Sequence, residues 1–201
     1  MFDFFKKNNQ LPDIYTIQLE PGDIVIDCGA NIGKVTEKLY IKGTEFYCFE
    51  PNPYAYEKLK NKFINKLNVN CYQNGVWINN CEKKLYFHEH SNKDEIHWST
   101  GSSYLEYKGN INKNKFIKTQ LVDLNEFIVS LKKKVRILKL DIEGLECPIL
   151  MKLINKETYK NIDYIFVETH EKKIPQLLEE TKLLTSTIKE KNITNIDLNW
   201  I

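Results

Sequence analysis

Short apolar runs alternate with segments of helical periodicity along most of the chain, and this alternation limits the folds it can adopt. The runs that we interpret as strands are residues 23–28, 45–49, 69–72, 135–141, 163–168 and 193–200. The segments that we interpret as helices are residues 34–41, 54–64, 123–131, 146–154 and 173–190. Strands joined by helical crossovers pair in parallel, so the pattern predicts an α/β fold with a mainly parallel sheet and helices on both faces.

Length and composition fit a single domain over residues 1–201, with 42% hydrophobic and 28% charged residues. A formal charge of +2 gives no electrostatic reason to expect a nucleic-acid partner, and no apolar run reaches the roughly 18 residues of a membrane span. The first residues, MFDFFKKNNQLPD, lack the order of a signal peptide, and the five cysteines form no C-x-x-C pair. We therefore expect a cytoplasmic protein with reduced thiols.

The middle of the chain departs from the βα pattern. Residues 75–90 alternate in the manner of a hairpin, and residues 115–121 resemble a further strand. The segment 91–114 between them is polar, contains Gly and Ser, and carries Trp98, Tyr104 and Tyr107. Its length favours a substrate-facing loop or lid whose aromatic rings contact the substrate, although a mobile surface excursion and core aromatics are alternatives.

The stretch VIDCGANIG, residues 25–33, predicts a strand that ends in a glycine loop before a helix. A dinucleotide fingerprint requires a middle glycine so that the pyrophosphate can approach the backbone, but Asn31 stands near that place. S-adenosylmethionine has no pyrophosphate, and its ammonium group could bind Asp27 directly or through water. The loop residues predicted to contact this cofactor are Asp27, Gly29, Ala30, Asn31 and Gly33.

Two further residues complete the expected cofactor site. Glu50 ends the second strand, where a carboxylate can accept hydrogen bonds from both ribose hydroxyls. The third strand is followed by no obvious acid for the adenine amino group, so Asn74 or a backbone carbonyl is expected to serve there.

The ends of two later strands carry acidic pairs, Asp141 with Glu143 and Glu168 with His170. Residues two apart point to one side of an extended segment, so these four are predicted to surround the reactive end of the cofactor as catalytic residues. Such a cluster suits a general base, the orientation of a hydroxyl, or a divalent cation. His170, with an unperturbed pKa of roughly 6.5, is one candidate base, and the individual base stays open.

Four motifs in order, VIDCGANIG, FEPNP, LKLDIEGLE and VETH, resemble those of the FkbM-type S-adenosylmethionine-dependent methyltransferases, as does GSSYL at residues 101–105. The resemblance runs from Pro21 to His170. It implies a Rossmann-like seven-stranded methyltransferase fold, here shortened at the C-terminus, and methyl transfer to a hydroxyl of a sugar or polyketide-like acceptor. It also assigns Asp141, Glu143, Gly144 and Glu146 to an acidic signature near the acceptor, although Glu146 could serve only as a helix-dipole partner.

The sequence therefore predicts an S-adenosylmethionine-dependent O-methyltransferase whose partner is a sugar, either a deoxysugar or a glycan. Two alternatives stay open: a non-catalytic module that binds S-adenosylmethionine or a glycan, and a metal-assisted O-methyltransferase of another small-molecule hydroxyl. The missing middle glycine disfavours an NAD-dependent oxidoreductase, and the lack of an N-P-P-Y-type motif disfavours a nucleic-acid methyltransferase.

Overall fold

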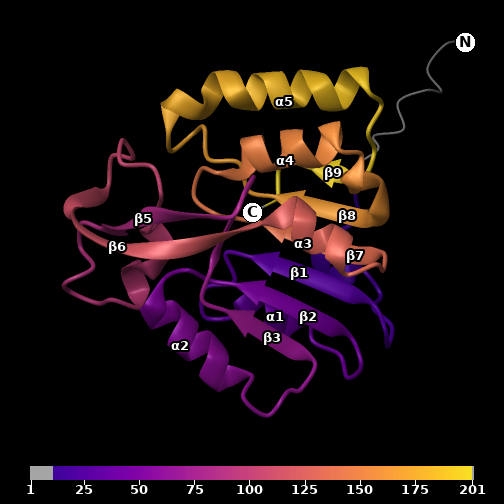
Figure 1. The fold of residues 1–201 in the computed structure, drawn as a ribbon, viewed down its shortest axis with the longest axis horizontal. Helices are drawn as coiled ribbons and strands as arrows, with labels where there is room; N and C mark the ends of the chain where they lie inside the picture. The colour runs from indigo at the N-terminus through magenta and orange to yellow at the C-terminus, as the bar shows by residue number, and fades with distance from the viewer. Residues whose placement is uncertain (1–10, 201) are drawn as a thin grey trace, which may run out of the picture.

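A parallel sheet forms the centre of the molecule (Figure 1), as the computed structural model of residues 11–200 shows. Residues 1–10, which make up most of the N-terminal segment MFDFFKKNNQLPD, lie outside the described residues. Within residues 11–200 the main sheet has six strands, all parallel, in the order β3-β2-β1-β7-β8-β9. They are β1 (Ile24–Cys28), β2 (Glu45–Phe49), β3 (Val69–Tyr72), β7 (Val135–Leu140), β8 (Ile162–Val167) and β9 (Ile196–Asp197). The predicted α/β fold is confirmed, and strand order reverses between β1 and β7.

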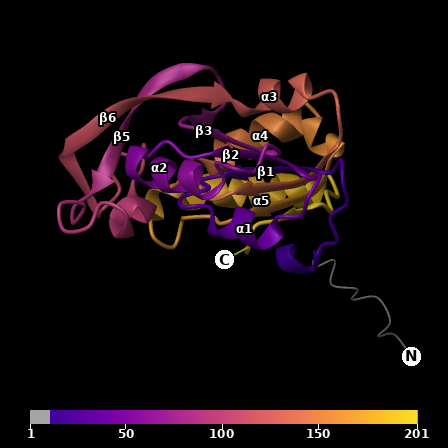
Figure 2. The ribbon, with the colours of Figure 1, turned by 90° about the horizontal axis from the view of Figure 1, so that it is seen from below.

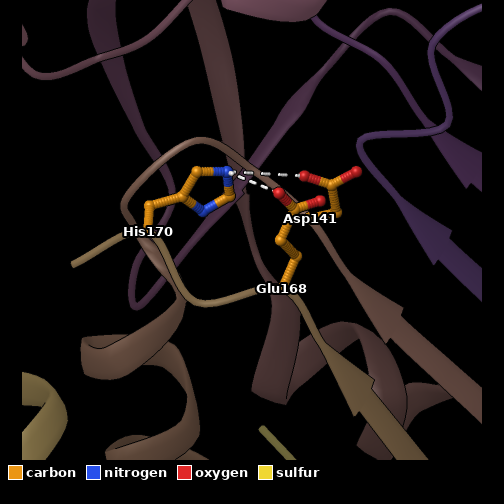
Figure 3. A group of neighbouring side chains, drawn as sticks. All are labelled: Asp141, Glu168 and His170. Carbon is orange, nitrogen blue, oxygen red and sulfur yellow. Dashed lines mark ion pairs between the residues drawn. The ribbon is translucent and has the colours of Figure 1, made fainter. Parts of the chain in front are cut away.

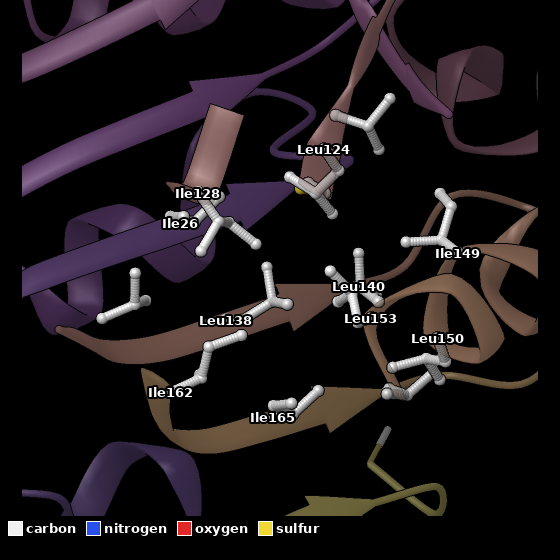
Figure 4. Close-up of a cluster of buried hydrophobic side chains, with 14 of the residues drawn as sticks. Ile26, Leu124, Ile128, Leu138, Leu140, Ile149, Leu150, Leu153, Ile162 and Ile165 are labelled. Carbon is white, nitrogen blue, oxygen red and sulfur yellow. The ribbon is translucent and has the colours of Figure 1, made fainter. Parts of the chain in front are cut away.

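Helices cover both faces of this sheet, as Figure 2 shows for α1 against α3 and α4. Side chains alternate along each strand, so Ile24 and Ile26 pack on one face while Val25 packs on the other. The first face is covered by α3 (Leu124–Ser130), α4 (Glu146–Asn155) and α5 (Leu178–Glu190), and its core is drawn in Figure 4. The second is covered by α1 (Lys34–Leu39), α2 (Pro53–Lys62) and the 3₁₀ turn η1 (Ile14–Thr16).

A second sheet projects beyond the main one, on the left of Figures 1 and 2. Its strands are β4 (Gly75–Trp77), β5 (Cys81–His88) and β6 (Ile111–Asp123), in the order β4-β6-β5. The predicted hairpin over residues 75–90 is therefore wrong, because β6 lies between its two arms, with Leu121 opposite both Gly75 and Cys81. The strand expected at 115–121 is also longer, because it pairs with β5 along most of that strand.

The C-terminal part has less regular structure than its sequence pattern predicts. Of the expected strand at 193–200 only β9 forms, because Asp197 accepts a hydrogen bond from the Asn199 N–H and turns the chain. The described residues thus contain six main-sheet strands, which agrees with the expected shortening of a seven-stranded fold. The last predicted helix is divided into η4 (Pro175–Leu177) and α5. The remaining 3₁₀ helices are η2 (His97–Gly101) and η3 (Thr158–Asn161). No helix in residues 11–200 has the length and apolarity needed to cross a membrane.

Candidate active site

A cavity of about 650 Å³ opens at the carboxyl ends of β1, β2, β7 and β8, over the point where strand order reverses. Its lining combines four parts of the chain: the loops after β1 and β2, the acidic strand ends, residues of β4 and β5, and a covering segment at residues 98–110 that we call the roof. The predicted site residues that line it are Gly29, Asn31, Glu50, Asn74, Asp141, Glu143 and Glu168. Asp27, Ala30, Gly33 and His170 lie behind this surface.

The two loop glycines are required by packing. Gly29 has φ +76°, and a Cβ there would lie 1.8 Å from the backbone oxygen of Asp141. Gly33 has φ +79° at the start of α1, and its Cβ would lie 2.6 Å from the Phe63 ring. Ala30 is buried in the core beneath the loop. Gly33 and Ala30 therefore shape the loop, whereas Gly29 presents its backbone to the cavity.

Asp27 forms a buried ion pair that the sequence analysis did not anticipate. Its Oδ1 lies 3.2 Å from Lys139 Nζ, and Thr36 Oγ1 donates a hydrogen bond to its Oδ2. Lys139 also donates to the Gly29 carbonyl at 2.8 Å. Burial by itself lowers the pKa of Lys139, but the charges of Asp27 and Asp141 outweigh it and hold the pKa above its ordinary value. Through Lys139, Asp27 supports the loop, and its predicted contact with an ammonium group, directly or through water, stays a prediction.

Glu50 presents a buried carboxylate to the cavity, with 6% of the residue exposed. Its Oε2 accepts a hydrogen bond from the Asn31 N–H and its Oε1 from the Asn52 N–H, both at 2.8 Å. Burial raises the pKa of Glu50 to about 7, and these two hydrogen bonds oppose the rise. Asn74 also lines the cavity, and its amide nitrogen donates to the Gln120 carbonyl.

The acidic strand ends meet as the sequence predicts (Figure 3). One carboxylate oxygen each of Asp141 and Glu168 and one ring nitrogen of His170 lie within 4.8 Å of one another. The His170 side chain is fully buried, with Nε2 3.5 Å from Glu143 Oε2 and Nδ1 3.0 Å from Glu146 Oε1. The latter contact is short but lacks the alignment of a hydrogen bond.

This environment changes the expected role of His170. Burial by itself lowers its pKa, but Glu146, Glu143 and Asp141 raise the value to about 9. These carboxylates favour the protonated ring when no cation is bound among them, and the side chain lies behind the cavity surface. A fully buried ring with a raised pKa is poorly suited to accept a proton from a bound hydroxyl, and the choice of general base stays a prediction.

Glu143 and Glu146 have different surroundings. Glu143 lines the cavity and pairs with buried Lys108, whose Nζ lies 2.6 Å from its Oε2. Burial raises the pKa of Glu143, while Lys108 opposes that rise. Glu146 accepts hydrogen bonds from the Ile142 and Gly144 N–H groups, so it fixes the loop before α4 in addition to serving the helix dipole. Lys108 was not predicted as a site residue, because it lies in the irregular segment 91–114, where hydrophobic periodicity gives no signal.

The roof is attached to the loops beneath it. Asn31 Nδ2 donates to Ser99 Oγ at 2.8 Å, and Ser103 Oγ donates to the Glu143 carbonyl at 2.8 Å. Trp98 lines the cavity and stacks on His88 with ring centroids 4.3 Å apart. Of the other two aromatics, Tyr104 lines the cavity and Tyr107 is exposed. These contacts argue against a surface excursion.

An open parallel sheet, a glycine loop after its first strand and a cavity over the switch point define a Rossmann-like α/β protein. Residues 27–192 match the Methyltransferase FkbM domain, and since this match covers most of the chain, the protein belongs to the FkbM methyltransferase family.

The structure is similar to the crystal structure of methyltransferase FkbM from Methylobacillus flagellatus, with a TM-score of 0.52 and 15% sequence identity. The similarity covers 85% of this chain and 39% of that chain, so the chain spans about two fifths of its neighbour's length. At this identity the comparison concerns the fold alone. No curated protein matches the sequence.

Proposed function

We propose that this protein transfers a methyl group from S-adenosylmethionine to a hydroxyl group of a sugar, either a deoxysugar or a glycan. The observation that carries the proposal is the shared cavity, in which Gly29 and Glu50 face the same space as Asp141 and Glu168. A cavity of about 650 Å³ suits a cofactor together with part of an acceptor.

The residues fit the cofactor in three respects. The Gly29 backbone leaves no room for a side chain and offers a close surface for the methionine part. The Glu50 carboxylate is the acceptor for the ribose hydroxyls, and Asn74, which lines the same cavity, is the predicted partner of the adenine amino group. The cofactor supplies an electrophilic methyl group on a positively charged sulfur, and the protein aligns the acceptor oxygen with it.

The acidic side of the cavity suits the acceptor. As the oxygen–carbon bond forms and the sulfur–carbon bond breaks, the hydroxyl proton passes to a cavity-facing carboxylate, for which the candidates are Asp141, Glu143 and Glu168. Trp98 and His88 present aromatic surface from the roof side, where the apolar face of a sugar ring can pack. His170, which lies behind these carboxylates, positions them.

The test is a screen of nucleotide sugars and deoxysugar glycans with S-adenosylmethionine, read as acceptor-dependent S-adenosylhomocysteine release and as added mass on the acceptor. With a productive acceptor, at least one of Asp141→Asn, Glu143→Gln and Glu168→Gln should lower kcat by about 100-fold or more. The cofactor Kd should change by less than about threefold, because these residues lie on the acceptor side. Glu82→Gln, on the exposed side of β5, serves as the control.

Near-normal turnover in all three variants would remove the catalytic assignment. Cofactor binding without acceptor-dependent product, across the whole screen, would instead favour a non-catalytic module.

A further inference from the structure

We propose that Asp141, Glu168 and His170 form a binding site for a divalent transition-metal ion. Asp141 follows β7 and Glu168 follows β8, so adjacent strand ends supply the two carboxylates. The His170 ring is fully buried, and its Nε2 has no hydrogen-bond partner among the described residues. Figure 3 shows this nitrogen directed at both carboxylates.

The distances within this group are slightly longer than those between ligands of a shared ion. Nε2 lies 3.7 Å from Asp141 Oδ1 and 3.8 Å from Glu168 Oε1. Both separations exceed the length of a hydrogen bond. Ligands about 2.1 Å from one metal ion lie roughly 3.0 to 3.4 Å apart in octahedral or tetrahedral geometry. The two His170 separations exceed this range by a few tenths of an ångström, and all three atoms lie within 4.8 Å of one another, so side-chain movement would bring them around one ion.

The second ring nitrogen of His170 supports the same interpretation. Nδ1 lies 3.0 Å from Glu146 Oε1, and Glu146 is itself held by the Ile142 and Gly144 N–H groups. A carboxylate behind the ring is the usual partner of a metal-binding histidine. Glu146 occupies that place, and a small rotation of the ring would align Nδ1–H with its Oε1. Here it directs Nε2 toward the two cavity-lining carboxylates.

Neighbouring lysines determine which oxygens remain for an ion. Lys139 lies 3.4 Å from Asp141 Oδ2, and this leaves Oδ1 toward His170. Glu143 already forms an ion pair with Lys108, so we do not include it among the ligands. Lys173 lies 2.7 Å from Glu168 Oε1, but its side chain is 61% exposed. A surface lysine contributes little to such a pair, so an ion can displace Lys173.

The ligand set indicates the class of ion. One imidazole nitrogen and two carboxylate oxygens form a mixed set, which suits Mn²⁺, Fe²⁺ or Co²⁺ better than the all-oxygen preference of Mg²⁺. Asp141 and Glu168 line the cavity, so the remaining coordination positions would face it. There the ion could bind the acceptor hydroxyl and lower its pKa as a Lewis acid. This catalytic role rests on the proposed function, whereas metal binding does not.

The binding test uses Mn²⁺ alone, titrated into the full chain at pH 8 and followed by the electron paramagnetic resonance signal of free Mn²⁺. We expect one ion per chain. Asp141→Asn and Glu168→Gln should each weaken binding by about tenfold or more, in line with the effects of perturbing metal sites. Lys173→Gln should tighten binding, because it removes the competing ammonium group. Asp163→Asn, at the opposite end of β8, is the matched control and should leave binding unchanged.

Absence of stoichiometric Mn²⁺ binding by both the wild type and Lys173→Gln would overturn the site. So would binding that Asp141→Asn and Glu168→Gln leave unaltered. Activity gives a separate result: with an acceptor in hand, EDTA should abolish methyl transfer and Mn²⁺ should restore it. Bound Mn²⁺ with EDTA-insensitive turnover would overturn the catalytic role alone. Bound Mn²⁺ without any methylated acceptor would count against the proposed function and leave the metal site standing.

Discussion

Replacing Glu50 with glutamine tests the cofactor half of the cavity most directly. The carboxylate lies between the Asn31 and Asn52 N–H groups, and burial raises its pKa to about 7. Two charged groups also act on it, since Lys139 lowers the pKa and Asp27 raises it. The variant keeps the shape of the side chain, but its NH₂ group must face one of the two backbone donors.

The expected loss of affinity follows from the hydrogen bonds at stake. A hydrogen bond to a charged group contributes about 1.5 to 3 kcal/mol, so weakening the ribose contacts should cost about 2 kcal/mol. That free energy corresponds to a Kd about 30-fold higher at pH 8. The wild-type Kd should also be about tenfold higher at pH 6 than at pH 8, because Glu50 becomes protonated as the pH falls through about 7.

The same ionisation affects folding stability with the opposite sign. The folded-state pKa of Glu50 lies above its ordinary value of 4.5, so the folded protein binds the proton more tightly than the unfolded chain. Glu50 therefore lowers the free energy of unfolding as the pH rises from 4.5 to about 7. Removing the ionisable group should flatten this part of the stability profile.

Calorimetric titration with S-adenosylhomocysteine at pH 6, 7 and 8 measures both binding effects. Glu45→Gln, at the half-buried start of the same strand, is the matched control and should bind as the wild type does. A Kd of Glu50→Gln within threefold of the wild-type Kd at pH 8 would contradict the assignment of Glu50 to the ribose. The same assignment would be contradicted if the Kd of the variant depended on pH as the wild-type Kd does.

Three further substitutions test the loop, the buried ion pair and the roof. Gly29→Ala should lower the free energy of unfolding by about 3 kcal/mol or more, because its Cβ would meet backbone at 1.8 Å. Gly22→Ala is its matched control, with φ +95° but open space around the Cβ, and thermal unfolding compares the two. Lys139→Met should cost about 3 to 5 kcal/mol in urea unfolding, and adding Asp27→Asn should recover most of the loss, because a buried charge is otherwise left unpaired. Trp98→Ala should raise the acceptor KM about fivefold and leave cofactor binding unchanged, in keeping with the loss of one aromatic contact.

The main sheet could be predicted from the sequence because its signals are local. Short apolar runs at residues 23–28 and 135–141 indicate buried strands whatever lies next to them, and the observed strands β1 and β7 agree closely. The partner of a strand depends instead on distant residues. The arms at 75–90 were recognised as strands, but nothing within them indicates that β6 lies between them.

Some features of the site could likewise be predicted from local sequence, and others depend on distant residues. Acids that follow adjacent parallel strands converge, so the meeting of Asp141 with Glu168 and His170 could be predicted. The charge of His170 could not, because it depends on Glu143 and Glu146, which the fold places around the ring. Lys139 left a signal in the sequence, since a lysine inside the apolar run VRILKL has to find an acid when the strand is buried.

Asn31 now has a structural reason for standing where a dinucleotide-binding loop has glycine. It adopts φ +49°, a conformation that asparagine tolerates better than most residues. Its backbone N–H donates to Glu50 and its side chain donates to Ser99 of the roof. A glycine could adopt the same backbone but would lose the bond to the roof. The roof is joined to the acceptor side as well, through Ser103 and the Glu143 carbonyl. The residue that departs from the fingerprint thus attaches the cofactor loop to the segment that covers both halves of the cavity.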